Sequence, residues 1–373
     1  MNKLACILFN RIYNTHRKRI FFMFKRTLLA TALATVVMSS HAYQIGDENN
    51  FSVEVYGIAA ISVVNYDTGD NDNGKESDQG FVVENESRIG FRAGKAMTDN
   101  IEVFMQVESG YVGGTDWGHG GTHGGVLGFR DTFVGLKGDW GKVRVGRVLT
   151  PLYEIVDWPF SNPGLGSVFD WGGISGHYDR QSNQIRYDQN FGDVAFAASV
   201  GRDAKTAAVG NGGGATKDSY FYGSSLKYAI KTVTLMGAVE AGSDFRGVEG
   251  QDNLSYIVGF DAGLPGGFGL AAAYKREAVD NYVGESATYD SEQDSISVVA
   301  QYWNGPVGLK LGYAANFDEK RNGDSQDDSD SNTVSAQLMG TVNGFVPYVR
   351  VAGRTVGAYD TDIVTRVGLE YGF

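Results

Sequence analysis

The sequence predicts an all-β fold, a transmembrane antiparallel β-barrel of sixteen strands with its third long loop folded into the lumen. Three observations lead to this fold class. Apolar and polar side chains alternate along segments of about ten residues, the length that a tilted strand needs to cross a bilayer. Short turns and long polar connections alternate along the chain. The composition, with 52 Gly, 21 Phe and 20 Tyr in 373 residues, suits strands that curve around a lumen and end in aromatic belts.

The N-terminal residues have the composition of an export signal. Lys25 and Arg26 precede an apolar stretch that ends at Met38, and small residues follow up to Ala42. A basic region, a short apolar region and a small-x-small site are typical of a cleavable signal peptide, so we expect cleavage after Ala42. The expected organisation is a mis-assigned extension over 1–22, or alternatively a longer leader from Met1, then a signal peptide over 23–42 and one barrel domain over 43–373.

The charge balance changes once the leader is removed. Residues 1–42 hold seven of the 32 Lys and Arg and none of the 44 Asp and Glu, so the exported chain carries 25 basic and 44 acidic residues and a net charge of -19. It also loses Cys6, the single cysteine, which suits passage through an oxidising periplasm. So acidic a chain is a poor partner for nucleic acid, and we expect none.

The last segment of the chain shows the strand pattern most clearly. Ile363, Val367 and Leu369 share one face, which ends in the aromatic residues Tyr371 and Phe373, whereas the opposite face is mostly polar or Gly. A period of two predicts a strand with one apolar and one polar face. The same period recurs and predicts strands at 51–64, 81–94, 100–111, 127–138, 141–149, 178–190, 193–202, 218–230, 232–241, 252–263, 267–276, 292–303, 306–317, 331–342, 344–354 and 361–373.

The connections between these strands favour a barrel over soluble β folds. Short turns fall on one side, as at 138–141 and 263–267, and long polar loops on the other, as at 203–217 and 318–330. A sandwich would have short connections at both ends. A propeller would repeat every ~40–50 residues, and the sequence has no such self-similarity. Sixteen strands leave a water-filled lumen.

The third long connection, 150–177, differs from the other loops. It contains Pro151, Pro159 and Pro163, half of the six prolines, and it also holds Trp158, Phe160, Phe169 and Trp171. Rigid prolines and apolar anchors indicate a loop that packs against something, and inside a wide barrel the nearby surface is the inner wall. Its acidic residues would then line one side of a constriction; they are Glu154, Asp157 and Asp170.

Basic side chains on the strands can supply the other side of the constriction. Arg88 and Arg92 alternate with Ile89, Phe91 and Ala93, which suit lipid, so both arginines should face the lumen. A basic side chain facing hydrocarbon would cost ~2–4 kcal/mol at the bilayer midplane. Opposed charged walls set the selectivity of a pore.

Three more arginines fit the same role. Arg130 begins a strand in which Phe133 is the expected lipid-facing residue, so Arg130 should face inward. Arg147 comes just before the third loop and Arg180 just after it. The alternative is that these arginines lie in the interior but away from the narrowest point.

Other chemistry has little support in the sequence. The acidic loops at 67–79 and 318–330 favour a solvated surface, with divalent-cation bridging to lipopolysaccharide as the weaker alternative. His119 and His123 lie in a Gly-rich loop rather than on a helix, so we expect no metal site, and no cofactor motif is present. No Ser or acid occurs in a motif with His, so we expect no enzyme activity.

Several strand motifs resemble the Gram-negative general porins. The resemblance rests on Tyr56-Gly57 in the first strand, Ser87-Arg88-Ile89-Gly90-Phe91, Phe104-Met105-Gln106-Val107-Glu108-Ser109-Gly110, Arg130 to Leu136, Gly141 to Pro151, and the terminal Phe373. These motifs lie mostly within residues 51 to 200. The chain departs from the family at Ile58, where some members have a basic residue, and in lacking a Pro-Glu-Phe-Gly-Gly run in the third loop.

The resemblance implies a homotrimer of sixteen-stranded barrels in the bacterial outer membrane, in contact with lipid and lipopolysaccharide. Each barrel would be a water-filled channel for passive diffusion of ions and small hydrophilic solutes. The family's basic residues correspond to Arg88, Arg130 and Arg180, its acidic ones to the third loop and above all Asp157, and its terminal assembly aromatic to Phe373. Two alternatives stay open: a solute-selective porin in which Trp158, Phe160 and Trp171 form a sugar track, and an adhesin or phage receptor.

Overall fold

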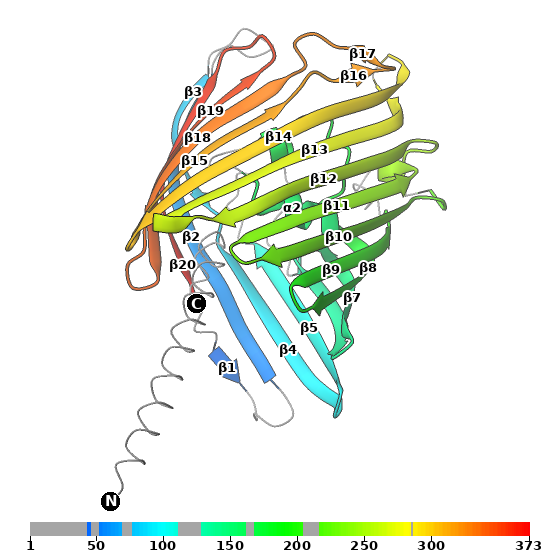
Figure 1. Ribbon diagram of the computed structural model, residues 1–373, viewed down its shortest axis with the longest axis vertical. Helices are drawn as coiled ribbons and strands as arrows, with labels where there is room; N and C mark the ends of the chain where they lie inside the picture. The colour runs from blue at the N-terminus through cyan, green and yellow to red at the C-terminus, as the bar shows by residue number, and fades with distance from the viewer. Residues whose placement is uncertain are drawn as a thin grey trace, which may run out of the picture.

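The chain forms a closed antiparallel barrel of sixteen wall strands, as the sequence predicts (Figure 1). The computed structural model describes residues 43–45, 52–68, 77–110, 128–161, 168–203, 216–284 and 286–373. Each strand pairs with its neighbours along the chain, and β2 pairs with β20 to close the wall. The proposed leader, together with His119 and His123, lies outside the described residues.

The wall consists of strands that match the predicted ones closely in number and position. The second predicted strand is divided into β3 and β4. The wall strands are β2 (Ser52–Thr68), β3 (Ser77–Asn85) with β4 (Arg88–Thr98), β5 (Ile101–Gly110), β6 (Thr132–Gly138), β7 (Gly141–Leu149), β8 (Arg180–Phe191), β9 (Val194–Arg202), β10 (Tyr220–Ile230), β11 (Val233–Ser243), β12 (Asp252–Gly263), β13 (Phe268–Val283), β14 (Thr288–Asn304), β15 (Val307–Asn316), β18 (Ser331–Gly340), β19 (Phe345–Val356) and β20 (Asp362–Gly372).

Smaller elements complete the fold. Strand β1 (Tyr43–Ile45) pairs with the start of β2, and β16 (Lys320–Arg321) with β17 (Asp324–Ser325) forms a hairpin beyond β15. Two short 3-10 helices, η1 (Phe245–Gly247) and η2 (Pro265–Gly267), lie in connections. Two short α-helices, α2 (Pro151–Asp157) and α3 (Val168–Trp171), lie in the third long connection. None of the helices in the described part of the chain is long and apolar enough to cross a membrane.

The two faces of the wall differ as the period of two requires. On β12, Leu254 and Val258 are 51% and 54% exposed, whereas Ser255 and Ile257 between them are fully buried. A soluble protein could not leave so many Leu, Ile and Val side chains uncovered around its circumference, but a barrel in lipid presents them to hydrocarbon. The polar and small side chains on the opposite face surround the interior.

One facing prediction on the fourth strand is wrong. Phe133 is only 7% exposed, whereas Val134 and Leu136 are 55% and 39% exposed. Phe133 therefore points inward, where its ring meets that of Phe104 edge to face at 5.6 Å. Arg130 still points inward, because β6 begins at Thr132 and the chain bends at Arg130 and Asp131, so the strand's alternation does not extend back to Arg130.

The two ends of the chain meet where the barrel closes. Gly57 and Phe373 exchange two backbone hydrogen bonds of 2.9 and 3.0 Å, which extend the β2–β20 ladder to the last residue. A Cβ on Gly57 would lie 2.5 Å from the Phe373 ring and 2.7 Å from the carbonyl oxygen of Arg88. Gly57 therefore provides the room in which the terminal aromatic ring lies against the wall.

Candidate functional site

The third long connection begins with a well-capped helix. The Thr150 hydroxyl accepts a hydrogen bond from the backbone N–H of Tyr153 at 3.2 Å, and Pro151 occupies the first turn, where no N–H donor is needed. The same hydroxyl donates to the carbonyl oxygen of Tyr178 at 3.2 Å and so ties the two ends of the connection together. α2 ends at Asp157 because Trp158, which precedes Pro159, is extended.

Apolar side chains of this connection pack against the buried face of the wall. Leu152, Ile155, Phe160 and Phe169 are fully buried, and their cluster includes small or flexible residues of β11 to β15 such as Met236. Figure 1 shows α2 behind these strands. This packing explains why the connection has an apolar sequence, although loops between strands are usually polar and exposed. The fully buried Phe160 cannot stack on a solute, so its expected place in a sugar track is wrong.

Polar side chains of the wall bind the backbone of the same connection. They donate to buried carbonyl oxygens of the connection, which need hydrogen-bond partners. The donors are Ser297 to Phe160 (2.6 Å), Lys275 to Phe169 (2.8 Å), Asn316 to Val168 (2.8 Å), and Asn253 and Ser255 to Gly176 (2.7 and 2.8 Å). The segment is therefore held at several points by hydrogen bonds as well as by packing.

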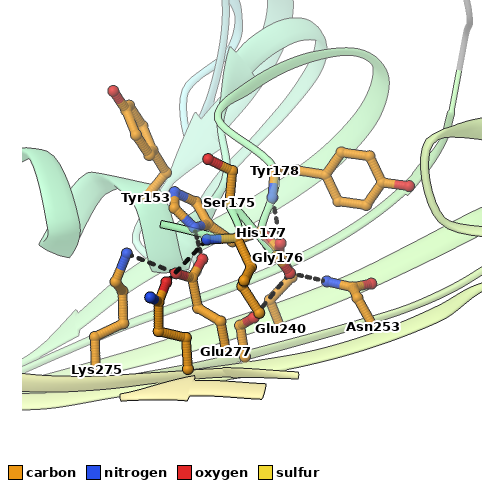
Figure 2. Close-up of polar contacts among 12 residues, drawn as sticks. Tyr153, Ser175, Gly176, His177, Tyr178, Glu240, Asn253, Lys275 and Glu277 are labelled. Carbon is orange, nitrogen blue, oxygen red and sulfur yellow. Dashed lines mark hydrogen bonds and ion pairs between the residues drawn. The ribbon is translucent and has the colours of Figure 1, made fainter. Parts of the chain in front are cut away.

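A buried charged cluster fixes the end of the connection (Figure 2). Glu277 on β13 binds the His177 ring with one carboxylate oxygen and the Lys275 ammonium with the other, the latter at 2.9 Å. The neighbouring Tyr178 donates its backbone N–H to Glu240 at 2.7 Å. The His177 ring also stacks on Tyr153, with 5.7 Å between ring centroids.

Asp157 is the acidic residue of the connection on which the charges of Arg88, Arg130 and Arg180 act. Its side chain is exposed to solvent at the C-terminal end of α2. Desolvation by the surrounding protein raises the pKa of the Asp157 carboxyl group. The positive charges of Arg180, Arg130 and Arg88 lower this pKa, but by less than desolvation raises it. The structure therefore brings Asp157 within the electrostatic field of the three arginines that the sequence places on the basic side.

Two of these arginines are already paired with acids of the wall. Arg130 binds Glu108, whose other carboxylate oxygen accepts the Tyr56 hydroxyl at 2.9 Å. Arg180 binds Asp131. These pairs hold the guanidinium groups in place and offset part of their charge. Arg88 is half-buried and has no ion pair with any residue in the described part of the chain.

The other two candidate arginines form no ion pair or hydrogen bond with the described part of the acidic connection. Arg92 lies over the Tyr56 ring at 3.8 Å and pairs with Glu54 at 3.4 Å. Arg147 donates to the carbonyl oxygen of Phe129 at 2.6 Å and stacks on the Phe129 ring. Both therefore interact with the wall.

The other two acidic candidates differ from Asp157 in their surroundings. Burial opposes the ionisation of Glu154, but its ion pairs with Arg186 and Lys227 outweigh that effect and lower its pKa to about 2. Asp170 is 5% exposed, and burial together with the negative charge of Asp157 raises its pKa to about 7. Asp157 is thus the most exposed of the three, and it lies in the field of Arg88, Arg130 and Arg180.

Some interior charges escaped the sequence analysis. Lys310, on β15, lies over the half-buried Trp158 ring at 5.0 Å, and Arg186 holds Glu154. Arg366, on β20, is 1% exposed and pairs with Glu84 and Glu86 of the second wall strand. Each of the three basic residues stands between two lipid-facing side chains on its strand, so the period of two could have assigned all three to the interior.

Two further candidates concern metals and sugars. No group of three or more His, Cys, Asp or Glu side chains within the described ranges could hold a metal ion. Of the aromatic residues expected to form a sugar track, Trp158 is half-buried and keeps part of its ring open, while the side chain of Trp171 lies outside the described residues.

Comparison with known proteins places these features in a family context. A family model described as Gram-negative porin matches residues 29–343. The chain is 57% identical to the chitoporin of Vibrio furnissii over 376 residues, covering 94% of this chain and 99% of that protein. It is 27% identical to a monosaccharide porin of Halomonas sp, covering 89% of this chain and 82% of the other.

Solved structures share the fold at low sequence identity. The anion-selective porin from Comamonas acidovorans aligns with a TM-score of 0.64 and 18% identity, covering 87% of this chain and 100% of that one. The trimer form of OmpT from Vibrio cholerae aligns with a TM-score of 0.64 and 15% identity, covering 87% of this chain and 100% of that one.

Proposed function

Because the chain belongs to the Gram-negative porin family, we propose that it is a sugar-selective porin whose main solutes are oligosaccharides derived from chitin. The protein is an outer-membrane porin, a channel and not an enzyme. The observation that carries the sugar proposal is the 57% identity to the chitoporin of Vibrio furnissii over almost the whole of both chains. The name of that relative refers to chitin, a polymer of N-acetylglucosamine.

The arrangement of the third connection supports this proposal. We propose that residues 150–177 lie inside the lumen and narrow it, with Asp157 facing Arg88, Arg130 and Arg180 across the opening. A sugar ring has an apolar face and a rim of hydroxyl groups. The half-open ring of Trp158 can cover the apolar face, while Asp157 and Lys310 beside it can bind the rim.

Single-channel recording in planar bilayers tests the sugar proposal. Chitohexaose should interrupt the ion current in a concentration-dependent manner, and maltohexaose, with as many rings but no acetamido groups, should do so far more weakly. Equal and weak effects of the two sugars would reject sugar selectivity and leave a general diffusion porin. Absence of any conductance would contradict the porin function itself.

Assembly and export are part of the same proposal. The trimeric form among the structural neighbours supports a homotrimer, so the current should close in three equal steps. The exposed apolar face would contact lipid, and the acidic loops would lie near lipopolysaccharide. Residues 23–42 would direct export and be removed after Ala42, which mass spectrometry of the purified protein would test.

A further inference from the structure

We propose that the interior also holds a binding subsite for the phosphate or carboxylate group of a small anionic solute. The site is a cavity of about 410 Å³ between α2 and strands β6 to β10. Its charged lining consists of Lys137, Lys142, Arg186, Lys227, Glu154 and Asp188. It differs from the Asp157 site, because none of the three arginines that face Asp157 lines it.

The cavity lies toward the end of the barrel that carries the short turns. Lys137 and Lys142 flank the turn between β6 and β7, and Asn190 precedes the turn between β8 and β9. In an outer-membrane barrel the short turns face the periplasm. The cavity is therefore at the periplasmic side of α2.

Basic side chains in and beside the cavity outnumber the acids that pair with them. Glu102 pairs with Lys137 at 3.0 Å, Asp188 with both Arg144 and Arg186 at 2.7 and 2.8 Å, and Glu154 with both Arg186 and Lys227. Three carboxylates thus serve four basic side chains. Lys142 is the fifth, and it has no ion pair with any residue that the structure describes.

The strand register places like charges directly opposite each other. Lys137 faces Lys142 across β6 and β7, and Arg144 faces Arg186 across β7 and β8. Like charges at opposed positions of neighbouring strands repel and destabilise the sheet. Asp188 already pairs with both Arg144 and Arg186, so a bound anion would mainly offset the repulsion between Lys137 and Lys142, which both line the cavity.

The remaining lining suits an oxyanion. Lysine ammonium and arginine guanidinium groups bind phosphate and carboxylate through charge-assisted hydrogen bonds. Gln189, Asn190 and Ser225 add neutral polar groups to the lining. The volume is large enough for an anionic group and part of the solute that carries it.

The test uses the complete, purified porin in planar bilayers, with inorganic tripolyphosphate as the probe. Current in KCl without the probe first tests the channel function, on which this inference rests. Tripolyphosphate added to the periplasmic side should block the current. Lys142→Gln should raise the half-blocking concentration roughly five- to tenfold, the effect of losing one charge-assisted contact, while Lys142→Arg should keep it near the wild-type value.

A matched control distinguishes binding at the subsite from a general effect of positive charge on the block. Lys231, in the turn between β10 and β11, is exposed at the same end of the barrel and does not line the cavity. Lys231→Gln should leave block unchanged. An open channel whose block is the same in wild type and in Lys142→Gln would overturn the proposal, as would an equal loss of block in Lys231→Gln.

Discussion

Asp157 lies at the end of α2, where its carboxyl group contacts solvent in the field of Arg88, Arg130 and Arg180. At the scale of single residues, we propose that this opposition of charges sets the ion selectivity of the channel. Distant loop charges matter less, because the Debye length is ~8 Å at physiological salt. The net charge of -19 that we expect after removal of residues 1–42 therefore does not decide the selectivity.

The first prediction concerns a variant that lacks positive charge at this site. In Arg88→Ala with Arg130→Ala, the remaining Asp157 and the unpaired Glu108 should favour cations. One charge about 5 Å from the path of an ion changes its energy by roughly 0.8 kcal/mol in water before screening, so the cation-to-anion permeability ratio should rise roughly two- to fourfold per lost charge. Reversal potentials in a salt gradient measure this ratio. An unchanged potential would reject the placement.

A second prediction at this scale concerns Asp170. Its pKa in the folded protein is raised from 3.8 to about 7, so the folded state holds a proton that the unfolded state has already released. Between about pH 4 and pH 7, the free energy of unfolding should therefore fall as pH rises, and no further loss should occur above that window. Asp170→Asn, which cannot ionise, should melt at a higher temperature than wild type at pH 8.

Thermal melting of the refolded protein, followed by electrophoretic mobility, checks this expectation. At pH 4 both proteins carry a neutral side chain at position 170, so their melting temperatures should nearly coincide. Equal melting temperatures at both pH values would show that Asp170 ionises without cost in the folded state.

At the scale of elements, α2 and α3 are held by packing and by hydrogen bonds from the wall. Phe160 is fully buried, and a Cβ on Gly259 would lie 2.5 Å from its ring, so the wall leaves room for this one side chain. The barrel ladders do not depend on it. Loss of the anchor should therefore loosen the connection while leaving the wall intact.

The third prediction follows from this difference between the connection and the barrel wall. Phe160→Ala removes a buried aromatic ring, a change that costs ~3–5 kcal/mol of packing. The variant should still form open channels, but their current should fluctuate more than that of wild type, since the connection is less firmly held. Phe81→Ala is the control, because Phe81 is 77% exposed on the outer face. Quiet currents in both variants would show that Phe160 is not an anchor.

The strands were predictable because their signal is local. The alternation around Ile363, Val367 and Leu369 depends only on neighbouring residues, and the structure confirms it. Phe133 was placed on the wrong face although β6 alternates without interruption around it, because Val134 and Leu136, and not the larger Phe133, mark the outer face of that strand. The break between β3 and β4 was missed for a different reason, since it depends on hydrogen bonds of Ser87 with Ala60.

The partners of the acidic residues were not predictable in this way. The contact of Glu154 with Arg186 and Lys227 depends on how a helix of the third connection meets strands β8 and β10. The burial of Asp170 likewise depends on packing between distant segments. The sequence could identify the connection that carries the acids, but not which acid keeps contact with solvent.

At the scale of the whole molecule, closure joins the first wall strand to the last. The backbone bonds between Gly57 and Phe373 complete this seam, and the Phe373 ring occupies the space where a side chain at position 57 would project. The terminal aromatic residue is thus part of the wall.

The fourth prediction tests the seam. Gly57→Ala should weaken folding by ~1–3 kcal/mol, the usual cost of overpacking, because the new methyl group meets the Arg88 carbonyl oxygen as well as the ring. Gly340→Ala is the matched control, since its nearest neighbour would be 3.7 Å away. The yield of heat-resistant assembled protein should fall for Gly57→Ala alone. An equal yield for both variants would contradict the role of the seam.

The most direct measurement of the central claim, that solutes pass between Asp157 and the arginines of the wall, uses a single thiol. Residues 43–373 contain no Cys, so Asp157→Cys introduces one reactive group. A charged, bulky methanethiosulfonate reagent should then reduce the single-channel conductance in discrete steps, while the same reagent should leave Ser325→Cys, in the exposed acidic loop, unaffected. A fully modified Asp157→Cys protein with unchanged conductance would contradict the account.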